Sequence, residues 1–211
     1  CFKVINKKLE LNALIMESNQ LTFDFTNNFK VSNNQQALDI CEALSYLFCK
    51  DGISKINMKI DGKSVSSFEN TTIPLSCITP NLGINNFETS TFDLYQTSSV
   101  LVYNEKEIAG KTYYIPTTTR IQNTNQTIDQ KVSLLLDHFE NNTKVETTKK
   151  SQLNDGLLSI YLSSRILDNS ENISPTLYSR LEKSFLSLPD VSSVHIYINN
   201  ELIQDDYRSE E

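Results

Sequence analysis

Apolar and polar positions alternate in the same way in two parts of the chain, 137 or 138 residues apart. Residues 21–29 match residues 158–166, and residues 53–62 match residues 191–200. The apolar sites coincide in pairs: Phe23 with Ile160, Phe25 with Leu162, Ile56 with Val194, and Ile60 with Ile198. A repeat of this length is typical of a duplicated domain, because solenoid units span only about 20–50 residues.

The first copy is predicted to contain two strands, a helix and a third strand. Alternation over residues 9–15 and 21–25 predicts a hairpin with a loop of about four residues between its strands. Polar N-cap candidates then precede a predicted helix over 36–48, whose apolar face comprises Leu38, Cys41, Leu44, Leu47 and Phe48. A strand over 53–60 follows, and the pair Asp61-Gly62 predicts a tight hairpin turn.

Further elements precede the second copy. Strands are expected at 100–103 and 111–115 around the Ala109-Gly110 turn, and Pro116 is expected to end the second of them. Thr127 should cap a helix that runs to about residue 141. A hairpin at 154–156 and a strand over 157–162 follow. A helix from Ser174, with Pro175 in its first position, and a strand over 191–198 complete the predicted order β-β-α-β-β-α-β.

These elements predict an α+β protein of two related small domains, each with helices packed on one face of a mostly antiparallel or mixed sheet. We assign residues 1–66 to the first domain, 67–97 to a connecting segment, 98–204 to the second domain and 205–211 to an acidic tail. Only 20 residues precede the strand at 21, far fewer than precede its counterpart within the second domain. The first domain is therefore expected to lack its opening strands and first helix, as a truncated or degenerate copy.

The net charge and the hydropathy of the chain argue against some classes of binding partner. The net charge of −7 and the pI near 4.9 argue against nucleic acid, because no basic surface is available to displace phosphate counterions. The same charge disfavours electrostatic binding to an anionic membrane. No run approaches the roughly 18 apolar residues that a membrane-spanning helix needs. Cys1 is a candidate lipid-attachment site, or merely the residue where a fragment starts.

The order of these motifs resembles the GerMN domain of GerM-type sporulation and spore-germination lipoproteins, in tandem copies. The likeness is carried by residues 21–25, 35–44, 53–62, 82–85, 100–103 and 113–116. One departure is that the second copy ends in Asn199-Asn200, where the first has Asp61-Gly62. The resemblance implies an extracytoplasmic, membrane-associated protein, anchored on the outer side of the cytoplasmic membrane through an N-terminal lipid. It also implies a role in assembly, with other envelope proteins as partners, and neither catalysis nor a cofactor.

The sequence offers little for catalysis. His195 lies in mid-strand and His138 lies near a helix end, where a partly charged imidazole is favourable without any metal. Asp24 alternates with two phenylalanines and should face solvent. The cysteines lack CxxC spacing, and Cys41 is expected to be a buried thiol rather than part of a disulfide. We therefore assign no catalytic, cofactor-binding or metal-binding residue.

Candidate surfaces for a partner are few. Tyr103 and Tyr113 could form a protein-facing or glycan-stacking surface, because tyrosine combines apolar area with a hydroxyl. Strand alternation predicts that one of Tyr113 and Tyr114 lies in the core. Asp61 and Gly62 form a turn that could be presented to a partner, although turn geometry alone requires such residues. The leading hypothesis is a scaffold that binds envelope proteins, and the alternatives are a cell-wall or glycan-binding surface lipoprotein and an envelope hydrolase.

Overall fold

The computed structural model describes residues 10–86, 94, 96–122, 126–139 and 145–203. The chain divides into two compact units, unit 1 (Cys1–Ser99) and unit 2 (Val100–Glu211). Each has its own core of buried side chains. Cys1 and the acidic tail at 205–211 lie outside the described residues.

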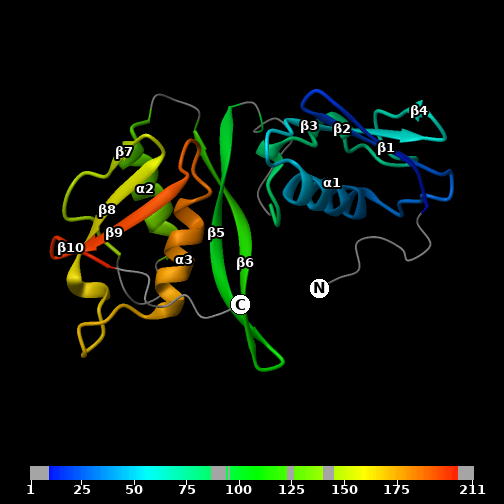
Figure 1. The fold of residues 1–211 in the computed structure, drawn as a ribbon. Helices are drawn as coiled ribbons and strands as arrows, with labels where there is room; N and C mark the ends of the chain where they lie inside the picture. Colours follow the sequence, from blue (N-terminus) through cyan, green and yellow to red (C-terminus); the bar gives the residue numbers. More distant parts are fainter. Residues whose placement is uncertain (1–9, 87–93, 95, 123–125, 140–144, 204–211) are drawn as a thin grey trace. The chain divides into compact units, whose positions relative to one another are not determined.

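Unit 1 is a four-stranded sheet covered by one helix (Figure 1). The strands follow one another across the sheet in chain order: β1 (Leu11–Glu17), β2 (Gln20–Phe25), β3 (Lys55–Ile60) and β4 (Lys63–Ser64). The two outer pairs are antiparallel, whereas β2 and β3 are parallel. A parallel pair needs a crossover connection. Helix α1 (Asn34–Phe48) lies between β2 and β3 in the chain and provides that connection.

Unit 2 repeats this arrangement with β7 (Gln152–Asn154), β8 (Leu157–Leu162), β9 (Ser193–Ile198) and β10 (Glu201–Leu202). Helix α3 (Pro175–Phe185) joins the central parallel strands. The registers agree residue by residue: Leu21 lies opposite Ile56 in unit 1, as Leu158 lies opposite Val194 in unit 2. The structure therefore confirms the duplication predicted from the sequence, with the same offset of 137 or 138.

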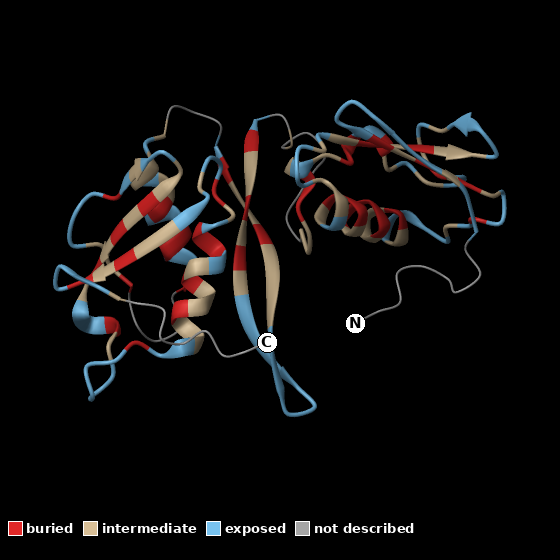
Figure 2. Ribbon diagram, in the orientation of Figure 1, coloured by how far each residue is buried: buried red, intermediate tan, exposed pale blue. Residues whose placement is uncertain are grey.

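Both cores follow from the period of two along the strands. In β2 the residues Leu21, Phe23 and Phe25 are buried, and their counterparts Leu158, Ile160 and Leu162 in β8 are buried as well (Figure 2). The intervening residues lie on the opposite face of each sheet. The helices supply the matching apolar face, with Cys41 and Leu44 in α1, and with Tyr178, Leu181 and Phe185 in α3.

Unit 2 has three further elements ahead of its sheet. Strands β5 (Thr97–Ile108) and β6 (Lys111–Gln122) form a two-stranded ribbon, and α2 (Ile128–Leu136) continues into a short 3-10 turn, η4 (Asp137–Phe139). Thr127 caps α2 as predicted, in a reciprocal capping box with Gln130. The predicted order β-β-α-β-β-α-β is confirmed, and β10 is added to it.

The predicted ends of the ribbon strands were wrong. Both strands are twelve residues long, and Pro116 lies within β6 instead of ending it. Proline lacks only an N–H, and one edge of each strand in a two-stranded ribbon has no strand to pair with, so proline is tolerated there.

The assignment of residues 67–97 to a connecting segment also needs correction. Two 3-10 turns in this segment, η1 (Leu75–Cys77) and η2 (Pro80–Leu82), add apolar residues to the core of unit 1. Ile78 is fully buried, and its carbonyl accepts a hydrogen bond of 2.9 Å from the N–H of Ile56 in β3. Single 3-10 turns leave no apolar periodicity, so the pattern could not reveal them.

Two local details differ from expectation. The loop between β1 and β2 has two residues instead of four, with Ser18 at a φ of 55°. In α1, Leu47 was predicted on the buried face but is 52% exposed, whereas Ile40 is 2% exposed. The helix is rotated from the predicted face because residues from the 68–86 segment cover one of its flanks.

The hairpin turns after β3 and β9 allow a reciprocal test. Gly62 has a φ of 76°, and an added Cβ would meet nothing within 4 Å, so Gly62→Ala isolates backbone strain. We expect a loss of about 1 kcal/mol in the free energy of unfolding. Asn200 occupies the equivalent position with a φ of 67°, and its Oδ1 accepts an exposed hydrogen bond from Lys149 Nζ. Asn200→Gly should therefore stabilise unit 2 by at most about 0.5 kcal/mol, because the relief of backbone strain is partly offset by the loss of this bond. Urea unfolding measures both, and effects of the same sign would contradict the shared turn geometry.

Candidate interaction surfaces

The backbone of Tyr103 is hydrogen-bonded to helix α3 and so connects strand β5 to this helix within unit 2. Its N–H donates to Ser184 Oγ at 2.9 Å, and Arg180 Nε donates to its carbonyl at 2.9 Å. Two residues earlier, the Leu101 N–H donates to Ser187 Oγ at 2.7 Å. Side chains of α3 and of the turn after it thus satisfy the outer edge of β5, where another strand would otherwise pair. The structure therefore gives Tyr103 a structural role, and its role toward a partner stays a prediction.

The other predicted tyrosine lies further along the ribbon. Tyr113 is 47% exposed, whereas Tyr114 is partly buried, with Lys183 Nζ 5.7 Å from its ring centroid. The prediction that one of the two lies in the core was too strong, because neither belongs to the buried set. A two-stranded ribbon has too little covering chain to bury a tyrosine fully.

The Asp61-Gly62 turn is held by its own unit. The Gly62 N–H donates to Asp24 Oδ1 at 2.9 Å, and Asn12 Nδ2 donates to Asp61 Oδ1 at 3.4 Å. Both turn residues have positive φ, 47° and 76°, as a type I′ turn requires. Turn geometry accounts for these residues, and a contact with a partner stays a prediction.

A surface that the sequence analysis missed lies on the helix-free face of unit 2. Tyr161, Tyr197 and Leu202 are direct neighbours across β8, β9 and β10. The two tyrosine rings stack with centroids 4.9 Å apart and an interplanar angle of 20°. Lys149 Nζ lies 5.3 Å from the Tyr161 centroid, and His195 meets Tyr197 edge-on at 6.3 Å. We call these five residues the aromatic row.

The equivalent positions in unit 1 are polar. By the strand registers, Asp24, Lys59 and Ser64 occupy the places of Tyr161, Tyr197 and Leu202. The same fold therefore forms without aromatic residues on this face. The row is visible in the sequence only when the outward-facing positions of the two copies are compared, because the repeat itself is carried by the apolar positions that face the core.

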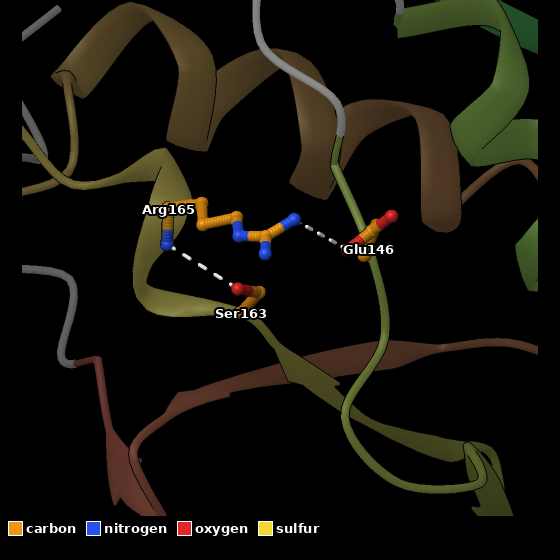
Figure 3. Close-up of polar contacts among 3 residues, drawn as sticks. All are labelled: Glu146, Ser163 and Arg165. Carbon is orange, nitrogen blue, oxygen red and sulfur yellow. Dashed lines mark hydrogen bonds and ion pairs between the residues drawn. The ribbon is translucent and has the colours of Figure 1, made fainter.

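The chain beside the row is fixed to the end of β8 (Figure 3). The Ser163 N–H donates to the Glu146 carbonyl at 2.8 Å, and Thr147 forms a bridge with Leu162. Arg165 Nη1 lies 3.3 Å from Glu146 Oε2, although the Arg165 side chain is 72% exposed and the pair adds little stability. These bonds hold the segment that leads to Lys149.

The described residues do not assemble a catalytic or metal-binding cluster. None of their His, Cys, Asp and Glu side chains form a group of three that could hold a metal ion. His138 Nε2 is hydrogen-bonded to Thr119 Oγ1 at 2.9 Å, and His195 belongs to the aromatic row. None of the described helices is long and apolar enough to cross a membrane.

The three described cysteines are free thiols. Cys41 and Cys77 are buried together in the core of unit 1. Their mutual hydrogen bond, followed by burial, raises the pKa of Cys41. Burial raises the pKa of Cys49 to about 11, and a hydrogen bond with Ser45 opposes this effect. Thiolate chemistry is therefore suppressed at neutral pH for Cys41 and Cys49.

The fold and the sequence of this chain both resemble those of known proteins. No family model matches the chain. The structure resembles a solved structure described as tandem GerMN domains of the sporulation protein GerM from Bacillus subtilis, with a TM-score of 0.72 and 21% identity. That match covers 92% of this chain and 72% of the solved one. The α+β fold of tandem GerMN domains is thereby confirmed.

The sequence match points to the same relative. The chain is 24% identical over 206 residues to the spore germination protein GerM of Bacillus subtilis strain 168, a match that covers 90% of the chain. It is therefore homologous to GerM, as the resemblance predicted. The chain spans about half the length of this relative, since the match covers 56% of it.

The raised pKa of Cys49 predicts a pH dependence in unit 1. Below pH 9.0, the usual pKa of a thiol, Cys49 is protonated in both the folded and the unfolded forms. Its full contribution to the free energy of unfolding is then present. Between about 9 and about 11, the unfolded thiol ionises while the folded one does not, so stability falls as pH rises. The difference in unfolding free energy between the wild type and Cys49→Ser should therefore shrink over this range. A difference that is constant from pH 8 to 11 would contradict the burial effect.

Proposed function

We propose that this protein is a non-enzymatic scaffold of the cell envelope that binds other envelope proteins during sporulation or spore germination. Homology to the spore germination protein GerM supports the process. We place the protein outside the cytoplasmic membrane and propose Cys1 as its lipid anchor.

The observation that carries this proposal is the aromatic row. The sheet of unit 1 folds in the same register with Asp24 and Lys59 where unit 2 has Tyr161 and Tyr197. Folding therefore does not require aromatic residues on this face. Tyr161 and Tyr197 are partly exposed, and aromatic side chains are enriched at protein interfaces. Divergence between two copies of one fold is a sign that the second copy has acquired a contact of its own.

The ring geometry favours a protein partner over a glycan. Sugars bind tyrosine by lying against a free ring face. In the aromatic row, the faces of Tyr161 and Tyr197 stack on each other, and Lys149 Nζ lies over the Tyr161 ring, 5.3 Å from its centroid. What the row offers to a partner is ring edges, hydroxyl groups, Leu202 and the positive charge of Lys149. A protein surface with apolar and carboxylate groups complements this set.

The test transfers the unit 1 pair into unit 2. The double variant Tyr161→Asp and Tyr197→Lys should cost less than about 1.5 kcal/mol of stability, since it removes one aromatic pair from a face that unit 1 keeps polar. Cross-linking with tagged protein in sporulating cells should recover at least about tenfold less of its envelope partners. Thermal unfolding confirms that the variant is folded.

Two controls distinguish binding of a protein partner at the aromatic row from binding of a glycan. Leu134→Asp changes an exposed apolar residue of α2 that is not part of the aromatic row, and it should leave partner recovery unchanged. Binding to purified peptidoglycan should be absent for wild type and variant alike. Unchanged partner recovery in the double variant, or peptidoglycan binding that depends on Tyr161 and Tyr197, would overturn the proposal.

A further inference from the structure

The three described cysteines lie where helix α1 meets the turn η1 in unit 1. Cys41, Ser45 and Cys49 follow one another at intervals of one helical turn, on one side of α1 and its C-terminal end. Ser45 Oγ donates to the Thr79 carbonyl at 2.6 Å, and Cys49 Sγ lies 4.0 Å from the Ile78 carbonyl. This side of the helix therefore faces the residues that directly follow η1.

The last residue of η1, Cys77, lies against Cys41. Both side chains belong to the buried core of unit 1, with Cys41 0% exposed and Cys77 7% exposed. Their thiols are hydrogen-bonded to each other. The two residues are 36 positions apart in the chain, so no spacing motif indicates the pair, although the burial of Cys41 was predicted. The tertiary structure thus brings together two thiols from separate elements.

The packing of a small apolar side chain does not by itself explain this pair. A single buried cysteine commonly serves as a small apolar residue. Counted back from the last helical hydrogen bond of each helix, Tyr178 of α3 occupies the place of Cys41, and it is buried as well. The fold therefore does not require a thiol at this position of the helix. Unit 1 nevertheless has a cysteine there and a second one directly against it.

The segment that carries Cys77 has little regular structure to hold it in place. Within residues 68–86 the structure assigns two single 3-10 turns, η1 and η2. The same segment supplies Leu75, Ile78 and Leu82 to the core, at 3%, 0% and 2% exposure. A covalent link from α1 to η1 restricts the unfolded chain by closing a long loop, and it therefore favours the folded position of this segment.

We propose that Cys41 and Cys77 form a disulfide bond when the chain meets an oxidising environment, and that this bond fastens η1 to α1. The inference rests on the proposed location outside the cytoplasmic membrane, because disulfides form and persist in oxidising compartments. Cys49 does not take part, since its thiol is directed at the Ile78 carbonyl and not at another sulfur.

The reaction is a thiol–disulfide exchange with a disulfide oxidant. Cys77 reacts first, because it is the more exposed of the two thiols and because the hydrogen bond with Cys41 lowers its pKa against the opposing effect of burial. Its thiolate attacks one sulfur of the oxidant, whose S–S bond breaks, and the first leaving thiolate takes up the proton that Cys77 has lost. Cys41 then attacks the Cys77 sulfur of the mixed disulfide, and its proton goes to the second leaving thiolate. Two protein thiols are thereby oxidised, and one disulfide is reduced to two thiols.

The experiment treats the purified full chain with oxidised glutathione. The chain carries Cys1→Ser, so that the proposed anchor residue cannot pair. After unfolding, alkylation and peptide mapping by mass spectrometry, Cys41 should be found joined to Cys77 in nearly all molecules, and Cys49 should be alkylated. Reduction of this bond should raise the equilibrium constant for unfolding in urea at least about thirtyfold, because the unfolded chain regains its freedom.

Two further variants serve as controls. Cys49→Ser is the matched control, because it removes the neighbouring thiol and should keep both the bond and the effect of reduction. Cys77→Ala removes one member of the pair, so a reductant should change its equilibrium constant for unfolding less than about twofold. The peptide map of the chain with both cysteines decides the proposal even if Cys77→Ala fails to fold.

Three results would overturn the proposed bond: Cys41 and Cys77 both alkylated after oxidation, a bond between Cys49 and Cys77 in its place, or equal stability of the oxidised and reduced chains. The purified chain is measured without any partner. Each of these failures therefore leaves the test on Tyr161 and Tyr197 unaffected, and a failure of that test leaves the disulfide to be decided here.

Discussion

The central parallel strand pair beneath one helix is the constraint on which both units depend. Parallel neighbours cannot be joined by a tight turn, so the helix must cross from the end of one strand to the start of the next. Every second residue of these strands must then be apolar, since a slip of one position would turn the buried set toward solvent. Both copies meet this requirement with the same register, from Leu21 opposite Ile56 to Leu158 opposite Val194.

The same constraint leaves the opposite face of each sheet free to change. Stability requires only that this face be compatible with strand pairing, and the two copies have used the freedom differently. Unit 1 has Asp24 beside Lys59, whereas unit 2 has Tyr161 stacked on Tyr197. A duplicated fold can in this way keep one strand register and carry two different surfaces.

The helices are covered in different ways, although they cross similar sheets. In unit 1, the 68–86 segment closes one flank of α1, and Glu42 accepts hydrogen bonds from the backbone of Asn85 and Asn86. In unit 2, the edge of β5 is satisfied by Ser184, Ser187 and Arg180. Among the described residues, the two units therefore cover the helix that crosses their sheet with different parts of the chain.

The sequence by itself determined the elements that depend on neighbouring residues: the period of the strands, the cap at Thr127, the turn at Asp61-Gly62 and the repeat. Local sterics and hydrogen bonding control these features, so they are visible in a short window of sequence. Only the tertiary structure decided which side of α1 is buried, that Ile78 completes a core, and that Tyr161, Tyr197 and Leu202 are neighbours. Those outcomes depend on contacts between residues far apart in the chain, and no local pattern encodes which distant residue arrives to cover a surface.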